Sequence, residues 1–173
     1  MSENSVTHEK FTGLILLTGD DKPGIAHGLF SALADFSIEI LDVEQLVISD
    51  RIVLTALIAL NSAHQGAIET DLNTFAAHSD VDIAVLFGKK TPSQQVSDLV
   101  SILVSKAKLH PHDLKLITEK LLELNLNIEA IARRSTSPII VELRVSGGSE
   151  DLILAALESL NFEDKPTFVV RSI

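Results

Sequence analysis

An internal repeat constrains the fold of this 173-residue chain more than any other feature. Pro111 lies 88 residues after Pro23, and Ile128 lies 88 residues after Ile40. The apolar and polar segments around these pairs follow one another in the same order. Self-similarity at a fixed period indicates consecutive copies of one structural unit. The sequence therefore predicts two copies of a single fold.

The first copy predicts strands and helices in the order βαββαβ. Apolar residues recur at helical spacing from Ile25 to Phe36 and again between Ser62 and Ser79. The other segments are short and rich in β-branched residues, which is typical of strands. The expected elements are strand 12–18, helix 25–36, strand 37–49, strand 52–60, helix 62–79 and strand 81–87.

The second copy repeats this order after a polar, proline-containing segment that lacks periodicity and reads as a linker. We expect a flexible arm at residues 1–10, a first domain at 11–89, the linker at 90–96 and a second domain at 97–173. The elements expected in the second domain are strand 99–104, a corner at 108–113, a helix face from Leu114 to Leu124, strands 127–134 and 139–145, a helix opening at Gly148 and strand 166–173.

The βαββαβ order is the ferredoxin-like arrangement, in which two helices cover one face of an antiparallel sheet. The predicted fold class is α+β, with two tandem ferredoxin-like domains. The uncovered face of such a sheet is expected to be polar where it meets water. In the segment 38–48, however, both alternating sets of side chains are largely apolar. We therefore expect a neighbouring copy to cover part of this face or to continue the sheet at its edge.

Composition excludes several classes of function. Hydrophobic residues make up 46% of the chain and charged residues 22%, as in globular proteins. The net charge of −10 argues against direct binding to nucleic acid, which needs clustered basic side chains. The absence of cysteine excludes disulfides and thiolate chemistry. No apolar run is long enough to cross a membrane and no signal peptide is evident, so we expect no membrane partner and a cytoplasmic location.

The segment Gly19–Gly24 predicts a corner between the first strand and the first helix. Pro23 has a φ suited to a first helical turn, and Gly24 lets the backbone approach a partner closely. The N–H groups of Gly24, Ile25 and Ala26 would then point outward at the positive end of the helix dipole and could hold a small anion. The alternative is a corner that only turns the chain. Its glycines match no nucleotide-binding motif.

An Asp-x-Pro-Gly corner in a ferredoxin-like unit, here Asp21–Gly24, resembles the ACT domain, a module that binds amino acids and regulates enzymes. The segments 39–48, 127–128 and 137–145 look like the tandem ACT region that precedes the catalytic domain of long bacterial phosphoserine phosphatases. The resemblance covers residues 12–173. It implies a regulatory pair that senses L-serine or a related amino acid such as glycine, with the ligand at an interface between ACT units, and it implies a homodimer formed by ACT–ACT packing.

The resemblance also implies a set of ligand-binding residues. The carboxylate of the amino acid would meet the amides of Gly24, Ile25 and Ala26, beside Pro23. Its ammonium group would meet Asp21, Asp42 or a backbone carbonyl. The second copy departs from the pattern because His112 stands at the position of Gly24. No cofactor or metal is expected.

Catalysis is not expected of this chain. The phosphatase family needs an Asp-x-Asp motif on a Rossmann-like domain, and Asp20–Asp21 has the wrong spacing. The chain is then either a regulatory fragment of a longer enzyme or a free-standing tandem ACT protein. The alternative function is a transcriptional co-regulator that acts by protein–protein contact, similar to the glycine-cleavage-system repressor.

Six further residues carry competing interpretations. His110 and His112 could ligate a metal but fit a solvated loop better, with Asp113 capping the following helix. His27 could couple ligand binding to pH, although an exposed histidine is the commoner case. Arg133 and Arg134 could hold a carboxylate or form a surface pair. Phe30 lies off the core face of its helix and could pack against a neighbouring unit.

Overall fold

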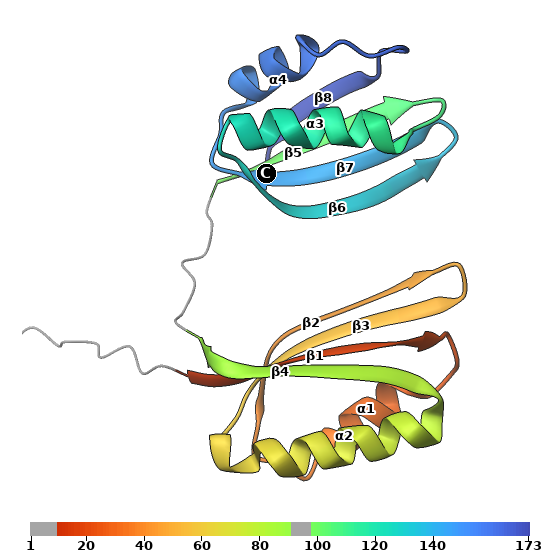
Figure 1. Cartoon of the computed structure of the whole chain (residues 1–173), viewed down its shortest axis with the longest axis vertical. Coiled ribbons are helices and arrows are strands. Elements are labelled where there is room, and N and C mark those ends of the chain that lie inside the picture. Colours follow the sequence, from red (N-terminus) through yellow and green to blue (C-terminus); the bar gives the residue numbers. More distant parts are fainter. Residues whose placement is uncertain (1–9, 91–97) are drawn as a thin grey trace, which may run out of the picture. The chain divides into compact units, whose positions relative to one another are not determined.

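The computed structural model describes residues 10–90 and 98–173, which form two compact units (Figure 1). Each unit has its own hydrophobic core, so the two are described separately. The predicted arm and linker fall almost entirely outside the described residues, and these domain boundaries stay a prediction. Both units are α+β with the predicted βαββαβ order.

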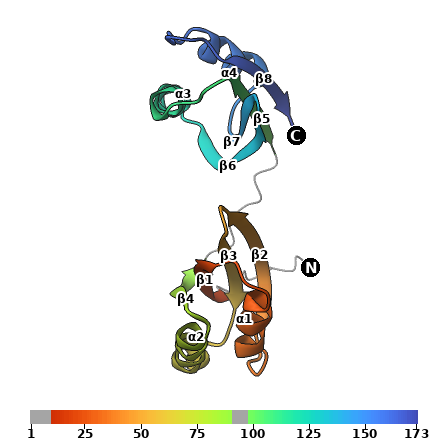
Figure 2. The same ribbon diagram turned by 90° about the vertical axis from the view of Figure 1, so that its right-hand side faces the viewer.

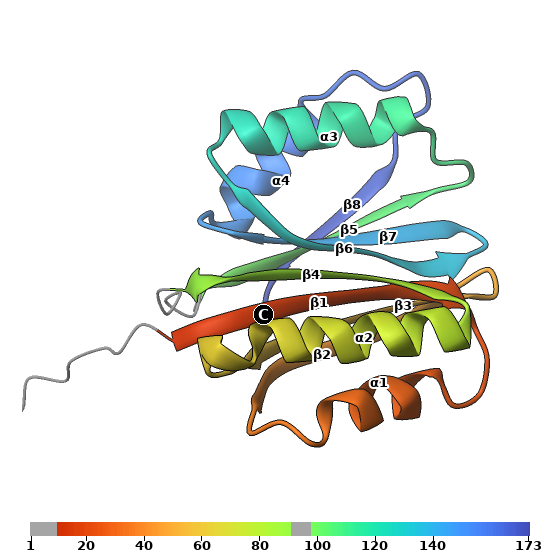
Figure 3. The ribbon, with the colours of Figure 1, turned by 60° about the horizontal axis from the view of Figure 1, so that its bottom comes forward.

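The first domain contains a four-stranded antiparallel sheet in the order β2-β3-β1-β4. Figures 1 and 3 show its helices on one face of this sheet. The helix α1 ends at Leu33, three residues before the predicted end. The strands β1 and β4 are longer than expected, β2 is shorter, and β3 has the expected length but begins one residue earlier. The elements are β1 Lys10–Asp20, α1 Ile25–Leu33, β2 Glu39–Ile48, β3 Arg51–Ala59, a 3-10 turn Ser62–His64, α2 Gln65–Ser79 and β4 Val81–Lys90.

The second domain repeats the topology, with the sheet order β6-β7-β5-β8 (Figures 1 and 2). Its first helix begins at Pro111, three residues before the predicted helix face. The connection between β6 and β7 contains a cis peptide bond at Ser137–Pro138. The elements are β5 Leu99–Lys106, α3 Pro111–Glu123, β6 Asn127–Thr136, β7 Ile139–Ser146, α4 Glu150–Glu158 and β8 Thr167–Ser172.

In the inner strands β3 and β7, buried and less buried side chains alternate, and the buried ones belong to the two cores. In β3, every second side chain from Ile52 to Ile58 is buried beneath the helices. In β7, Val141, Leu143 and Val145 are buried in the same way. Because successive strand residues point to opposite faces, the other half of each strand lines the face without helices.

The faces without helices differ between the domains. In the first sheet this face has exposed leucines, among them Leu14, Leu16 and Leu86. In the second sheet Ser101 and Arg134 both donate hydrogen bonds to Glu142, which lowers the pKa of that carboxyl, and these bonds outweigh the effect of burial. The first face is therefore apolar, and the second holds a polar network.

The edge strand β2 is exposed along its whole length. Its apolar side chains occur on both faces of the sheet, as the sequence predicts, and they are 38–63% exposed. They are Ile40, Leu41, Val43, Leu46, Val47 and Ile48. A long, exposed, apolar edge strand is a ready template for pairing with another strand.

Candidate functional site

The predicted corner in the first domain is shaped by Gly24. This residue has a φ of 95°, in the left-handed region, and serves as the N-cap of α1. A side chain at this position would be strained, although a Cβ there would meet nothing within 4 Å. Pro23 therefore precedes the cap and does not lie in the first helical turn, contrary to its predicted placement. The corner depends on glycine for its backbone conformation and is open to solvent.

Two of the three predicted amides are available to a ligand. The N–H of Ile25 points back to the carbonyl oxygen of Lys22 at 3.4 Å, and the side chain of Ile25 is buried in the core. Among the described residues, the N–H groups of Gly24 and Ala26 have no acceptor. Unpaired amides at the start of a helix carry partial positive charge and attract anions.

A pocket of about 350 Å³ brings most of the predicted site together. Five of the six predicted ligand-binding residues line it, and the pocket also contains four residues outside the predicted set. The predicted ones are Asp21, Pro23, Gly24, Ile25 and Ala26, and the others are Lys22, His27, Gln45 and Ile52.

Asp42, the sixth predicted residue, lies on the opposite face of the sheet. It pairs with Leu57, whereas Gln45 pairs with the buried Leu54 on the face that the helices cover. A regular alternation would place Ile40 and Asp42 on the same face of the sheet. A β-bulge between them shifts the register, so that they lie on opposite faces. The Asp42 carboxylate accepts a hydrogen bond from the N–H of Val43 at 2.9 Å. The structure thus places Gln45, which sequence reasoning missed, where Asp42 was expected.

The carboxylate of Asp21 forms no ion pair among the described residues, unlike the neighbouring acid. Asp20 forms an ion pair with Arg51 at 3.0 Å, and Lys22 lies 3.8 Å from Asp20 as well. The backbone N–H of Asp21 donates to the carbonyl of Asp50, which holds the corner against the β2–β3 turn. Asp21 is therefore the free acid beside the exposed amides.

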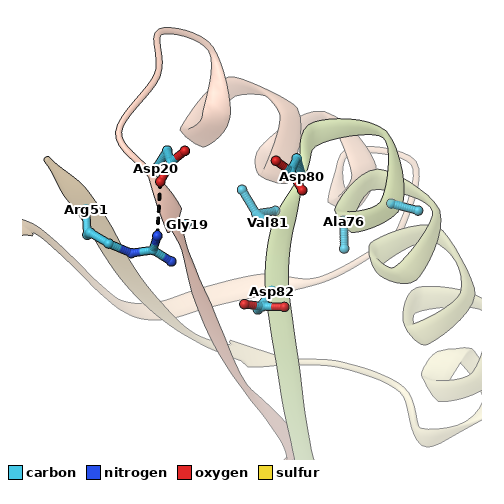
Figure 4. Close-up of a pocket in the computed structure, with 8 residues that line it drawn as sticks. Gly19, Asp20, Arg51, Ala76, Asp80, Val81 and Asp82 are labelled. Atoms are coloured by element: carbon cyan, nitrogen blue, oxygen red, sulfur yellow. Dashed lines mark hydrogen bonds and ion pairs between the residues drawn. The ribbon is translucent and has the colours of Figure 1, made fainter.

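A second pocket, of about 370 Å³, lies at the end of β1 and the start of β4 (Figure 4). Asp20, Asp80 and Asp82 contribute carboxylates, and Arg51 forms an ion pair with the first of them. In this view the Asp80 and Asp82 side chains stand apart from that ion pair. The described residues contain no group of three metal-ligating side chains. None of the predicted site residues belongs to this pocket.

At the corresponding corner of the second domain, a buried ion pair joins the end of β5 to the start of α3. Lys106 Nζ donates to Asp113 Oδ1 at 2.8 Å, and both side chains are more than nine-tenths buried. The other oxygen of Asp113 accepts the N–H of His110 at 2.8 Å. Burial raises the pKa of Asp113, but the hydrogen bonds from Lys106 and His110 and the charge of Lys106 outweigh it and hold that pKa below its usual range.

The sequence contained a signal for this ion pair. Lys106 follows Val100, Ile102 and Val104 at alternate positions of β5, so a charged residue occupies an inward-facing position. A buried charge needs a partner. Asp113, predicted only as a helix cap, is that partner.

The fold and the open corner define a tandem ferredoxin-like protein, and comparison with known proteins specifies the family. Residues 12–85 match the model of the ACT domain. The chain is 30% identical to the phosphoserine phosphatase of Streptomyces coelicolor over 88% of its own length, and 30% identical to that of Mycobacterium tuberculosis over 79%. It spans 38% and 34% of those two proteins.

Solved structures match both domains together. A crystal structure described as a glycine cleavage system transcriptional repressor has a TM-score of 0.74 at 14% identity, covering 95% of this chain and 98% of the other. A protein of unknown function from Galdieria sulphuraria has a TM-score of 0.75, also at 14% identity, covering 95% of this chain and 99% of the other. At this identity the likeness shows the fold alone.

The chain is an ACT domain protein with two ACT-like sheets, distantly related to the N-terminal region of phosphoserine phosphatases. Within the described residues, no helix combines the length and apolarity that a membrane crossing requires.

Proposed function

We propose that this chain is an amino-acid-binding regulatory module, with L-serine or a related small amino acid as its ligand. The observation that carries the proposal is one open pocket lined both by unpaired helix amides and by the residue with an unpaired carboxylate, Asp21. An amino acid has a carboxylate that can accept from the amides and an ammonium group that can donate to the Asp21 carboxylate. Its chemistry therefore matches both parts of the pocket.

In the proposed complex, the ligand carboxylate accepts hydrogen bonds from the N–H groups of Gly24 and Ala26. The ammonium group donates to Asp21, and the Gln45 amide contacts the ligand from the sheet. Hydrogen bonds to charged groups contribute roughly 1.5–3 kcal/mol each. Two or three of them supply the about 4–8 kcal/mol that corresponds to a Kd between millimolar and micromolar.

The relationship to phosphoserine phosphatases supports a place in serine biosynthesis, with the module acting as the allosteric part of such an enzyme. Catalysis in that case belongs to a part of the protein outside the matched region. The chain covers just over a third of the two phosphatases. We assign no catalytic residue within it.

We further propose that the module works as a homodimer through the exposed edge strand β2. Pairing of β2 with the same strand of a second copy would give its free backbone N–H and C=O groups hydrogen-bond partners. It would also cover apolar side chains such as Val43 and Val47. Sedimentation velocity of the variant Val43→Lys tests this, with Ile131→Lys on the edge strand β6 as the control. The two variants are matched because both side chains are about half exposed on edge strands. The proposal requires that the first variant alone be monomeric. A monomeric parent protein would contradict it.

A thermal-shift screen of the amino acids tests ligand binding. A ligand present at a hundred times its Kd adds about 2.7 kcal/mol of stability. Asp21→Asn should abolish the shift, whereas Asp35→Asn, at an exposed acid outside the pocket, should leave it unchanged. No shift with any amino acid, or an unchanged shift in Asp21→Asn, would remove the sensor proposal.

A second candidate function is a co-regulator that acts by protein contact. The exposed apolar residues of β2 and of the open sheet face favour it, because surfaces of this kind are typical of protein interfaces. A pull-down of a DNA-binding activator that Val43→Lys disrupts, together with no amino-acid response, would support this function over the sensor.

A further inference from the structure

The open face of the first sheet, meaning the face without helices, has unpaired carboxylates along its free edge. The register between β2 and β3 places Asp42 and Glu44 of β2 on this face. Both side chains are exposed, and neither forms an ion pair among the described residues. Arg51 is the one cation among the described side chains of the face, and it is already paired with Asp20. The edge therefore carries negative charge that this face does not neutralise.

Pairing of β2 with its copy, as proposed above, would concentrate these acids. A symmetric pairing that keeps both open faces on one side is antiparallel, and residues directly opposite then share a face. The regular part of β2 beyond its bulge is 42–48. When this part overlaps fully, Glu44 of one copy lies diagonal to the partner's Glu44, and the next register places the two directly opposite, about 5–8 Å apart. Like charges in these positions destabilise a strand pair, so the seam between the two strands needs cations from elsewhere.

The open face of the second domain has arginines that could supply them. Arg144 of β7 and Arg171 of β8 are the two cross-strand neighbours of Ser101 on this face. The two acids of the face, Glu129 and Glu142, already accept hydrogen bonds from side chains of their own domain. Arg144 lies 3.8 Å from Glu142, and Arg171 has no hydrogen-bond partner among the described residues. Two guanidinium groups are thus left without a close acceptor.

The two open faces also match in their apolar parts. Leu14, Leu16 and Leu86 are exposed on the first face. On the second face Val169 is 37% exposed, beside its cross-strand neighbour Leu103. Sheets that pack face to face lie about 10 Å apart with their side chains interdigitating, which is within the reach of an arginine side chain. Such packing would cover the apolar centre and bring opposite charges together.

We propose that the open face of the second domain packs over the β2 seam of the homodimer, where Arg144 and Arg171 bind Asp42 and Glu44 of the partner copy. This inference rests on the β2 homodimer proposed above and supplies the cations that its seam needs. The occupant of the face is a second copy of this chain, because the acids of two copies meet only at the seam. Two-fold symmetry makes the contact twice in each dimer.

Sedimentation equilibrium of single arginine variants tests the contact. Arg144→Gln and Arg171→Gln should each raise the Kd of the dimer by about threefold or more, since each removes a cation that faces carboxylates. Arg133→Gln is the matched control, because this arginine of β6 pairs with the buried Val141 on the face that the helices cover. Equal Kd values in all three variants would overturn this proposal and leave the β2 dimer standing. A monomeric parent protein would overturn both.

A change of sign separates this contact from a general effect of net charge. Glu44→Gln alone should weaken the dimer by about threefold, because the arginines lose an acceptor. Combined with Arg144→Gln and Arg171→Gln, it should instead tighten the dimer, because only repulsion between the two copies of Glu44 is then removed. Asp82→Asn changes the same charge on β4, at the far edge of the same face, and should show no reversal. An effect of Glu44→Gln with the same sign in both backgrounds would overturn the proposal.

Introduced cysteines show which copy provides the contact, because the chain has none of its own. Copies with Asp42→Cys, mixed with differently tagged copies with Arg144→Cys, should form a mixed disulfide dimer under mild oxidation. A mixture with Asp82→Cys in place of Asp42→Cys is the control and should form none. If the first mixture forms none, while one chain with both Asp42→Cys and Arg144→Cys closes a disulfide within itself, the assignment to a second copy is overturned.

Discussion

The two β–α corners occupy the same position in the repeat but are built in opposite ways. In the first domain α1 begins at Ile25, an apolar residue whose side chain is buried, and the corner before it is open. In the second domain α3 begins two repeat positions earlier, at Pro111, and the position of Ile25 is held by Asp113. The buried acid takes the backbone N–H of His110 and the ammonium of Lys106.

This difference shows that one fold can begin the same helix in two ways. A helix start can leave its N–H groups to a ligand, or it can satisfy some of them with its own side chains. In the first domain Gly24 is the cap, and the N–H groups of Gly24 and Ala26 have no acceptor among the described residues. The second domain uses Asp113 for the latter, and Asp113 also lines a groove at this corner.

The largest effect is expected from removing the buried acid. Asp113→Ala should destabilise the second domain by about 3–5 kcal/mol, because it leaves the buried Lys106 without a partner. Amide hydrogen exchange of β5 and β7 measures this, with β1 and β3 as an internal reference for the first domain. The control is Asp151→Asn in the first turn of α4, which should lower the free energy of unfolding by less than about 1 kcal/mol.

Replacing both partners should reverse most of that loss. The double variant Lys106→Met with Asp113→Leu removes both charges together, and apolar replacements of buried ion pairs are often neutral or stabilising. If the double variant were as unstable as Asp113→Ala, the cost would come from something other than the unpaired lysine.

A smaller effect is expected where the helices of the first domain meet. A Cβ on Gly28 would clash with the ring of Phe75, whereas Leu116 holds this repeat position in the second domain. Gly28→Ala should therefore destabilise the first domain by about 1–3 kcal/mol. Gly66→Ala in α2 is the control, since its Cβ meets nothing within 4 Å and should gain up to about 1 kcal/mol. Equal stability of the two variants in urea unfolding would contradict the close packing.

A still smaller effect is expected at the cap of α1. Gly24→Ala should cost about 1 kcal/mol, because alanine is strained at a φ of 95°. His112→Gly, at the same repeat position in the second domain, has no such backbone requirement and should change stability by less than about 0.5 kcal/mol. Thermal unfolding of the two variants makes this comparison.

The smallest effect is expected from mild acid. The pKa of Asp113 lies below its ordinary value in the folded state, so its ionised form stabilises the second domain at pH values above the ordinary aspartate pKa of about 3.9. That stability is lost as the pH falls through the lower folded pKa. Hydrogen exchange should show β5 and β7 losing protection below about pH 4, and Lys106→Met with Asp113→Leu should lose less.

Much of the architecture was predictable from local patterns. Helical spacing, β-branched runs and the tight connection at Ser49–Arg51 predict the order of the elements, because each depends on residues near one another in sequence. The structure narrows this connection to Ser49 and Asp50, which both have positive φ, as a type I′ hairpin turn requires. The ends of helices were less predictable. Residues 34–36 continue the apolar spacing of α1, yet the helix stops at Leu33.

The candidate site was predictable only in part. Its contiguous residues from Asp21 to Ala26 lie together because they share one corner. Contacts from other strands depend on register, and a single bulge in β2 places Gln45 beside the corner and Asp42 on the far face. A one-residue bulge could not be located from the sequence, because the side chains predicted for the two faces of this strand are both largely apolar.

The repeat, the strand and helix order and the Asp-x-Pro-Gly corner were determined by the sequence alone, because periodicity and turn chemistry are local properties. Only the tertiary structure decided that Gly24 caps α1 in the left-handed conformation, that Lys106 and Asp113 form a buried pair, and that β2 stays exposed. Each of these depends on which distant residues share a neighbourhood, and burial and pairing energies are set there rather than along the chain.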